Sequence, residues 1–158
     1  NEVIRSGNWY GNDTTWRMVL DLNKALFFYN GTSERRAKPL KYMTIVDGIV
    51  AGEGNGPVAV DAKLCGVVVA GFNPVAVDTV CAAIMGFDYK KIPMIVNAWK
   101  IKEQPLVDFS EGEIICRSNV EYWNGTLDDL YKAYHFGFAP HFGWTGHIER
   151  STGEKGMP

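Results

Sequence analysis

From Cys65 to Asp78 the chain reads CGVVVAGFNPVAVD, and this stretch decides the class of fold that we expect. Its first seven residues form a β-branched run without polar alternation, which is typical of a strand covered on both faces. Asn73 is a suitable N-cap, Pro74 suits the first helical position, and Gly86 is typical of the residue that follows a helix. A buried strand followed directly by a helix indicates an α/β domain.

A second predicted strand lies upstream, from Tyr42 to Val50, and runs into an acidic, glycine-rich segment. Residues 45–57 read IVDGIVAGEGNGP. Apolar residues at helical spacing predict helices at residues 15–29, 74–86 and 127–136. We therefore expect a single α/β domain over residues 1–150, with a mixed, mainly parallel sheet covered by helices. The small, polar residues 151–158 are expected to be a disordered tail.

The composition excludes several classes of partner. Sixteen basic and eighteen acidic residues among 158 leave a net charge of −2, so no attraction to nucleic acid is expected. The chain lacks an apolar run long enough to cross a membrane and a signal peptide at its start, which predicts a cytoplasmic protein. Because it also starts without methionine, we expect it to be an excised fragment or a processed product.

The acidic glycine-rich segment is the first candidate site. Its glycines miss the dinucleotide-binding spacing, and Glu53 would repel a phosphate. Asp47 and Glu53 suit a divalent cation such as Mg²⁺, Mn²⁺ or Ca²⁺, a substrate ammonium or sugar hydroxyls, and Asn55 could add an amide oxygen. The alternative is a tight loop whose carboxylates only cap nearby amides.

Asp78 is the second candidate, since it lies near the start of the helix that follows Asn73. The helix dipole alone could account for a carboxylate there. However, ligands of open α/β sheets bind at the carboxyl ends of strands, and both acidic elements would follow strands. If those strands are parallel neighbours, Asp47, Glu53 and Asp78 meet at one edge of the sheet, with Asn73 beside them.

These segments together resemble a known family. The order of DGI at 47–49, EGNGP at 53–57, GVVVAG at 66–71 and NPVAVD at 73–78 is similar to domain of unknown function 362. The resemblance covers about residues 42–96 and implies an α/β protein of a type found in bacteria and archaea. Members of the family are usually longer before this set of motifs, which implies that the chain is the C-terminal part of a longer protein. Many members of the family carry ferredoxin-type iron–sulfur clusters with grouped cysteines. The three cysteines of this chain are widely spaced, so no iron–sulfur cluster is expected here.

All three histidines lie in an aromatic, glycine-rich C-terminal segment. His141 and His147 could converge on a metal with Glu149 as a third ligand, or either could act as a general base. Trp144 could stack on a sugar ring. The alternative is that the aromatic residues pack onto the sheet and the histidines are partly exposed.

The favoured function is a small-molecule or divalent-metal site in an enzyme domain of unknown reaction, with a small polar molecule as ligand. The alternative is a non-catalytic module that docks onto a partner, onto its own missing N-terminal half or onto a second copy. Exposed aromatic residues near both ends of the chain favour this alternative. An electron carrier is disfavoured by the cysteine spacing.

Overall fold

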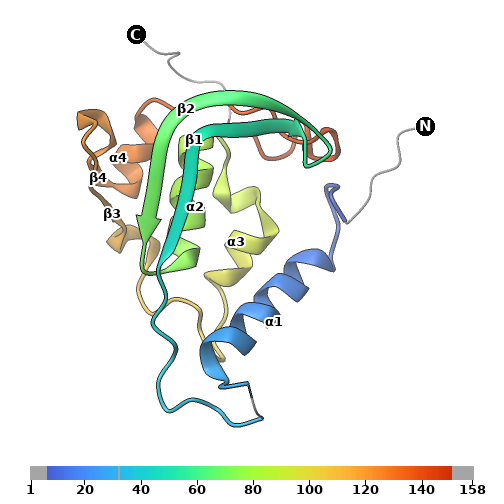
Figure 1. The fold of residues 1–158 in the computed structure, drawn as a ribbon, viewed down its shortest axis with the longest axis vertical. Helices are drawn as coiled ribbons and strands as arrows, with labels where there is room; N and C mark the ends of the chain where they lie inside the picture. The colour runs from blue at the N-terminus through green and yellow to red at the C-terminus, as the bar shows by residue number, and fades with distance from the viewer. Residues whose placement is uncertain (1–6, 32, 151–158) are drawn as a thin grey trace.

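A long β-hairpin arches over the helices in the computed structural model, which describes residues 7–31 and 33–150 (Figure 1). Strand β1 (Thr44–Asn55) pairs antiparallel with β2 (Ala59–Gly71), and only residues 56–58 connect them. The register shifts between Gly48 and Val50, which marks a bulge. A second, small antiparallel pair joins β3 (Ile115–Cys116) to β4 (Gly125–Thr126).

The expectation of one mixed α/β domain is confirmed, but the expectation of a mainly parallel sheet is corrected. Both strand pairs within the described residues are antiparallel. The connection of β1 to β2 is too short for the crossover that a parallel pair needs. The glycine-rich segment is not a loop after a strand, because β1 continues through Gly52 and Gly54 as far as Asn55.

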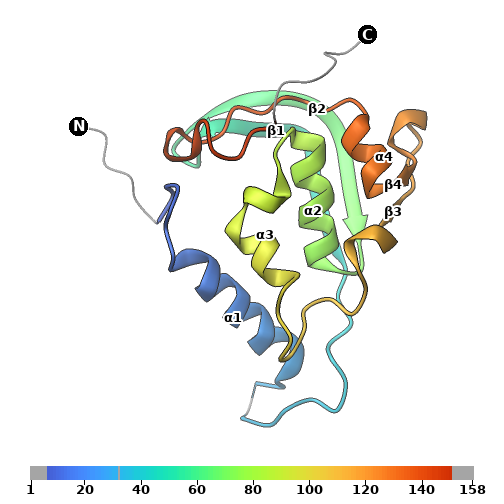
Figure 2. The ribbon, with the colours of Figure 1, turned by 180° about the vertical axis from the view of Figure 1, so that it is seen from behind.

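Four α-helices accompany the hairpin in the described part of the chain, and Figure 2 shows them from behind. They are α1 (Thr15–Phe28), α2 (Pro74–Met85), α3 (Pro93–Ala98) and α4 (Leu127–Lys132). The first two match their predicted bounds within one residue, whereas the helix predicted over 127–136 ends at Lys132. None of the helices described here combines the length and the apolarity needed to span a membrane.

The ends of α2 confirm the capping prediction. The side chain of Asn73 accepts a hydrogen bond from the amide of Ala76 at 3.1 Å and donates one to the carbonyl of Leu106 at 2.8 Å. Gly86 ends the helix with φ of +95°, a left-handed conformation that favours glycine. Gly71 brings the end of β2 against α2, where a Cβ atom would lie 2.7 Å from Val77. The residue types at Gly71, Asn73 and Gly86 therefore determine where α2 begins and ends, directly after β2.

Two clusters of buried side chains form the core. The larger one packs α2 and α4 together with Trp123, which precedes α4, and with Phe138 and Ile148, which follow it. The smaller one packs α1 against the start of α2 and the end of α3, through Leu20, Phe27, Val75 and Ala98. The hairpin contributes to the larger cluster only through its inner face, with Ala51, Cys65, Val67 and Val69.

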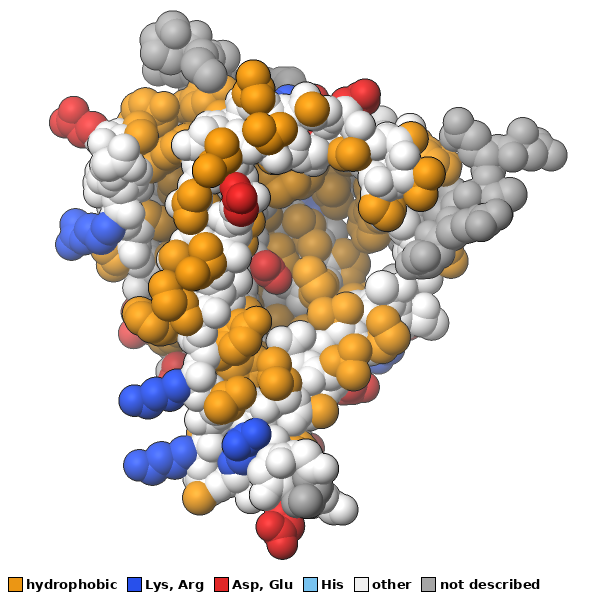
Figure 3. Space-filling model, in the orientation of Figure 1, with side chains coloured by type: hydrophobic (Ala, Val, Ile, Leu, Met, Phe, Trp, Pro, Cys, Tyr) orange, Lys and Arg blue, Asp and Glu red, His pale blue; other side chains and the backbone are white. Residues whose placement is uncertain are grey.

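The outer face of the hairpin is exposed and apolar. Hydrophobic side chains gather along it in Figure 3. The exposed side chains that define it here include Ile45, Asp47, Val50, Val60, Leu64 and Val68. Leu64 is 80% exposed and Val68 is 60% exposed, although the uninterrupted apolar run predicted cover on both faces. Within the described residues, only the inner face has that cover.

Candidate functional site

A cleft of about 680 Å³ lies between the hairpin, α1, α2 and the segment after α4. It opens as the hollow between the hairpin and α1 in Figure 3. Its walls are mainly apolar and include Trp16, Met85, Phe138 and Trp144. Glu53, Asp78 and His141 also line it, so three of the predicted site residues meet here.

Asp78 is the half-buried carboxyl of this cleft. It lies one turn into α2, and its side chain has no hydrogen-bond partner among the described residues. Burial raises the pKa of the Asp78 carboxyl, because the charged form loses hydration. Carboxylates in protein interiors are ordinarily paired, so an unpaired one facing a cleft is available to a ligand.

Cys81 lies one turn after Asp78 on α2 and lines the same cleft. Burial raises the pKa of the Cys81 thiol to about 11, and the charge of Asp78 adds to this effect. The nucleophilic form of cysteine is the thiolate, which is scarce so far below the pKa. Cys81 therefore contributes an uncharged thiol to the cleft wall at neutral pH and does not act as a nucleophile there.

Glu53 has a different role, because its carboxylate is already paired. Its Oε2 atom accepts hydrogen bonds from Lys63 Nζ at 2.7 Å and from the amide of Ala139 at 2.8 Å. The Lys63 ammonium, together with the Ala139 amide, holds the pKa of Glu53 below its usual range. The carbonyl of Ala139 also accepts a hydrogen bond from the amide of Gly54 at 2.9 Å. Glu53 thus ties the hairpin to the segment that forms one wall of the cleft.

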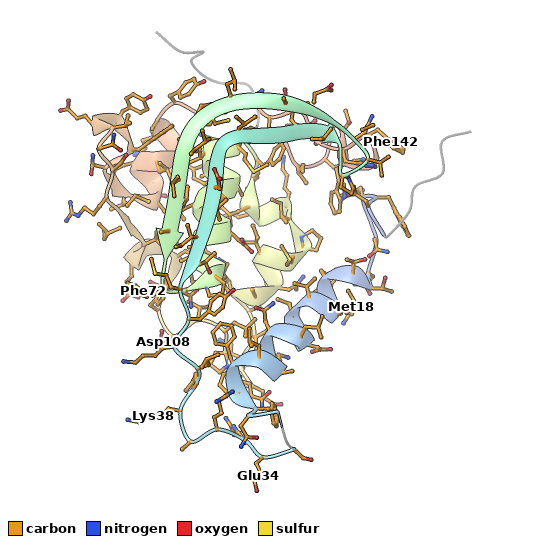
Figure 4. The ribbon with its side chains drawn as sticks, viewed as in Figure 1. Met18, Glu34, Lys38, Phe72, Asp108 and Phe142 are labelled. Atoms are coloured by element: carbon orange, nitrogen blue, oxygen red, sulfur yellow. The ribbon has the colours of Figure 1, made fainter. Side chains whose placement is uncertain are left out.

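Asn55 performs a similar task at the tip of the hairpin. Its side-chain oxygen accepts a hydrogen bond from the amide of Phe142 at 3.1 Å. Figure 4 shows Phe142 beside this tip, at the opposite end of the hairpin from Phe72. Asn55 is outside the cleft lining, so it fastens the C-terminal segment rather than orienting a ligand.

Asp47 does not join the other acidic residues. It lies on the exposed outer face of β1, opposite Val68, and its Oδ1 atom accepts a hydrogen bond from the amide of Ile49 at 3.0 Å. Asp47 is outside the cleft lining. The expected meeting of Asp47 with Asp78 assumed parallel strands that end at one edge, whereas the hairpin is antiparallel and Asp47 lies near the start of β1.

The remaining predicted site residues have structural partners. Asn73 caps α2. The ring of His147 stacks on Tyr10, with ring centroids 3.7 Å apart. Glu149 accepts hydrogen bonds from the amides of Gly146 and Ile148 at 2.8 and 3.2 Å. His141 lines the cleft, and its Nδ1 atom accepts a hydrogen bond from the amide of Gly143 at 3.1 Å.

The candidate metal ligands do not gather at one point. Across residues 7–31 and 33–150, no three His, Cys, Asp or Glu side chains lie close enough to hold one. His141, His147 and Glu149 therefore do not form a ligand group there. A divalent cation at Glu53 and Asp78 stays a prediction that rests on two carboxylates, one of which Lys63 neutralises.

A larger cavity of about 960 Å³ runs along the edge of β2 that faces away from β1. The charged residues that line it are Asp108, Glu113 and Arg117, and all three are exposed. Glu113 is also engaged in a capping box with Ser110. Water therefore solvates the charges of this cavity, which distinguishes it from the cleft at Asp78.

Sequence reasoning missed two residues of the cleft wall and one ion pair beside the cleft. Trp16 of α1 and Met85 of α2 were assigned to helices without a role, although both line the cleft. The pairing of Lys63 with Glu53 was not predicted, because it depends on the register of the hairpin. The alternation of Asp61, Lys63 and Cys65 along β2 was the available signal, since it places Lys63 on the inner face.

Comparison with known families gives one match. The family model described as Domain of unknown function (DUF362) matches residues 5–83, which is half of the chain. The chain belongs to this family. The DUF362 match includes α1, the hairpin and most of α2, and with them Glu53 and Asp78. Phe138 and His141, on the opposite wall of the cleft, lie outside it. Searches of the curated proteins and of the solved structures gave no match.

Proposed function

We propose that this DUF362 domain binds a small organic molecule in the cleft between the hairpin, α1 and α2. The observation that carries the proposal is the carboxyl of Asp78, which is half-buried and unpaired among the described residues at the wall of a 680 Å³ cleft. Ligand sites are typically apolar concavities of this size with a few polar groups that fix orientation. Asp78 would supply the polar contact, and Trp16, Met85 and Trp144 the apolar surface.

The enzyme hypothesis depends on the same carboxyl. An acid whose pKa is raised toward neutrality exchanges protons more effectively with a bound molecule than an ordinary surface aspartate. Asp78 is therefore the residue that we propose for any proton transfer in this cleft. Glu53 is unsuited to that role because Lys63 and Ala139 occupy its carboxylate.

The cleft can be tested by filling it. Val19 of α1 lines the cleft, whereas Leu22 of the same helix is 61% exposed and lies outside it. Amide chemical shifts recorded with a set of fragment-sized organic compounds should change at Gly52, Gly54 and Cys81 in the native protein. We expect Val19→Trp to reduce the affinity of these compounds about tenfold or more, because the indole would occupy their volume. Leu22→Trp should leave the affinity unchanged.

Two results would overturn this proposal. One is a set of shifts confined to the outer face of the hairpin or to the larger cavity beside β2. The other is equal affinity in Val19→Trp and Leu22→Trp, provided that both variants unfold at the same urea concentration as the native chain.

A second candidate function is docking to another protein through the outer face of the hairpin. Contiguous exposed apolar surface of this kind marks interaction sites on soluble proteins. Asp47 is the only charged residue among the six that define this face. A second copy would bring another Asp47 and no basic residue, which would bury carboxylates without a counter-charge. We therefore propose a different protein as partner, with an apolar surface and a lysine or arginine opposite Asp47.

Synthetic peptides distinguish the possible partners. A peptide of alternating valine and lysine should bind the native chain more tightly than one of alternating valine and glutamate, and Asp47→Asn should abolish the preference. Equal binding of the two peptides would contradict the role of Asp47. Concentration-dependent dimerisation in sedimentation velocity, abolished by Leu64→Glu, would identify a second copy as the occupant instead.

A further inference from the structure

The charges around the cleft specify which kind of molecule it would take. Two carboxyl groups line the cleft, and no lysine or arginine is among the described residues that line it. Lys63 neutralises Glu53 from the hairpin side, at 2.7 Å. One carboxyl charge, that of Asp78, is therefore left without a counter-ion.

The apolar walls add a second requirement. Trp16 and Trp144 offer aromatic surface, and Met85 and Met94 offer flexible thioether side chains that adapt to irregular shapes. Indole rings also attract cations that approach their faces. Trp16 already makes such a cation–π contact, because the guanidinium of Arg17 lies 4.4 Å from the centre of its ring.

We propose that the ligand is a small organic cation, an ammonium group on an apolar body, with its charge at Asp78. This inference rests on the proposed function of the cleft. The ammonium would replace the water that Asp78 has lost through burial, and the apolar body would contact the tryptophan and methionine side chains. A neutral or anionic molecule of the same shape would leave the carboxylate unpaired or repel it.

Binding of a cation at Asp78 depends on pH. The titratable groups that face Asp78 around the cleft are Glu53 on β1, with its partner Lys63, Cys81 on α2 and His141 on the C-terminal segment. Neither α1 nor α3 contributes a titratable side chain to the lining. Because a cation binds the ionised form of Asp78, its affinity falls as the pH is lowered through the pKa of Asp78. That pKa is raised, so the fall starts at a higher pH than an ordinary aspartate would give.

The probes are 2-phenylethylamine, 2-phenylethanol and 3-phenylpropionate, which share a phenyl ring and differ in charge. Their dissociation constants would be measured by amide chemical shifts on the full chain at pH 7.5. We expect the amine to bind about tenfold or more tightly than the alcohol, and the carboxylate to bind most weakly. Asp78→Asn should remove the preference for the amine and leave the affinity for the alcohol unchanged.

Asp61→Asn is the matched control, because Asp61 is an exposed carboxylate on β2 that lies outside the cleft. It should preserve the preference for the amine. The cation proposal would be overturned if the amine and the alcohol bound equally tightly. The small-molecule site would still stand if both compounds shifted amides of the cleft and Val19→Trp abolished those shifts. Amine binding that Val19→Trp leaves unchanged would overturn the site itself.

Discussion

Replacing Phe138 with alanine is expected to lower the free energy of unfolding by about 3–4 kcal/mol. Phe138 is 8% exposed and belongs to the larger core cluster, where its ring packs edge-to-face on Phe136 with centroids 6.4 Å apart. The Lys63 ammonium also lies 5.2 Å from the centre of its ring. Truncation would leave a cavity in the segment that forms one wall of the cleft. Urea denaturation followed by tryptophan fluorescence measures this change in the free energy of unfolding.

Phe142→Ala is the control for this prediction. Phe142 is four residues further along the same segment and is 36% exposed, so its truncation removes less buried surface. We expect a loss below about 1 kcal/mol for this variant. Similar losses for Phe138→Ala and Phe142→Ala would contradict the packing described for the cleft wall.

A second large loss of stability is expected when Glu53 is replaced. Glu53→Ala should lower the free energy of unfolding by about 2 kcal/mol, because it leaves the Lys63 ammonium and the Ala139 amide without their acceptor. About one fifth of each side chain in the Glu53–Lys63 pair is exposed, so the pair is only partly screened by water. The double variant with Lys63→Met should cost less than the sum of the single variants, since it removes both charges together.

Asp61→Ala is the comparison for Glu53→Ala. Asp61 lies directly opposite Glu53 in the hairpin and is exposed, so its removal should change the free energy of unfolding by less than about 0.5 kcal/mol. The role assigned to Glu53 would be lost if both alanine variants unfolded at the same urea concentration.

The pH dependence of the Glu53 effect has a definite sign. The pKa of Glu53 is lower in the folded chain than in the unfolded chain, so its stabilisation is complete above the unfolded value of about 4.3. The stabilisation is lost as the pH falls through the folded pKa. The difference in unfolding free energy between the native chain and Glu53→Gln should therefore be largest near neutral pH and shrink in acid.

The sequence predicted those parts of the fold that depend on local signals. Asn73 and Gly86 mark the ends of α2 through the conformations that their own residue types favour. The direction of β2 relative to β1 had no such signal. Glycines at 52 and 54 were interpreted as the end of a strand, yet they lie inside β1 as it approaches the tip of the hairpin.

The candidate site was predicted only in part, because it also depends on the direction and register of the strands. Glu53 and Asp78 both line the cleft. The expectation that they meet assumed parallel strands, whereas the antiparallel pairing places the end of β1 and the start of α2 at opposite ends of the hairpin. Their unequal roles depend on register, which places Lys63 beside Glu53 and leaves Asp78 unpaired among the described residues. Asp47 was misplaced because strand direction decides which residues share an edge.

The carboxyl of Asp78 offers the most direct measurement. Its ¹³C chemical shift can be followed as a function of pH, with and without saturating 2-phenylethylamine. We predict a titration above the usual aspartate range in the free protein, and a shift to lower pH when the amine is bound. An Asp78 that titrates in the ordinary range and does not respond to the amine would contradict the proposal that this carboxyl anchors a ligand in the cleft.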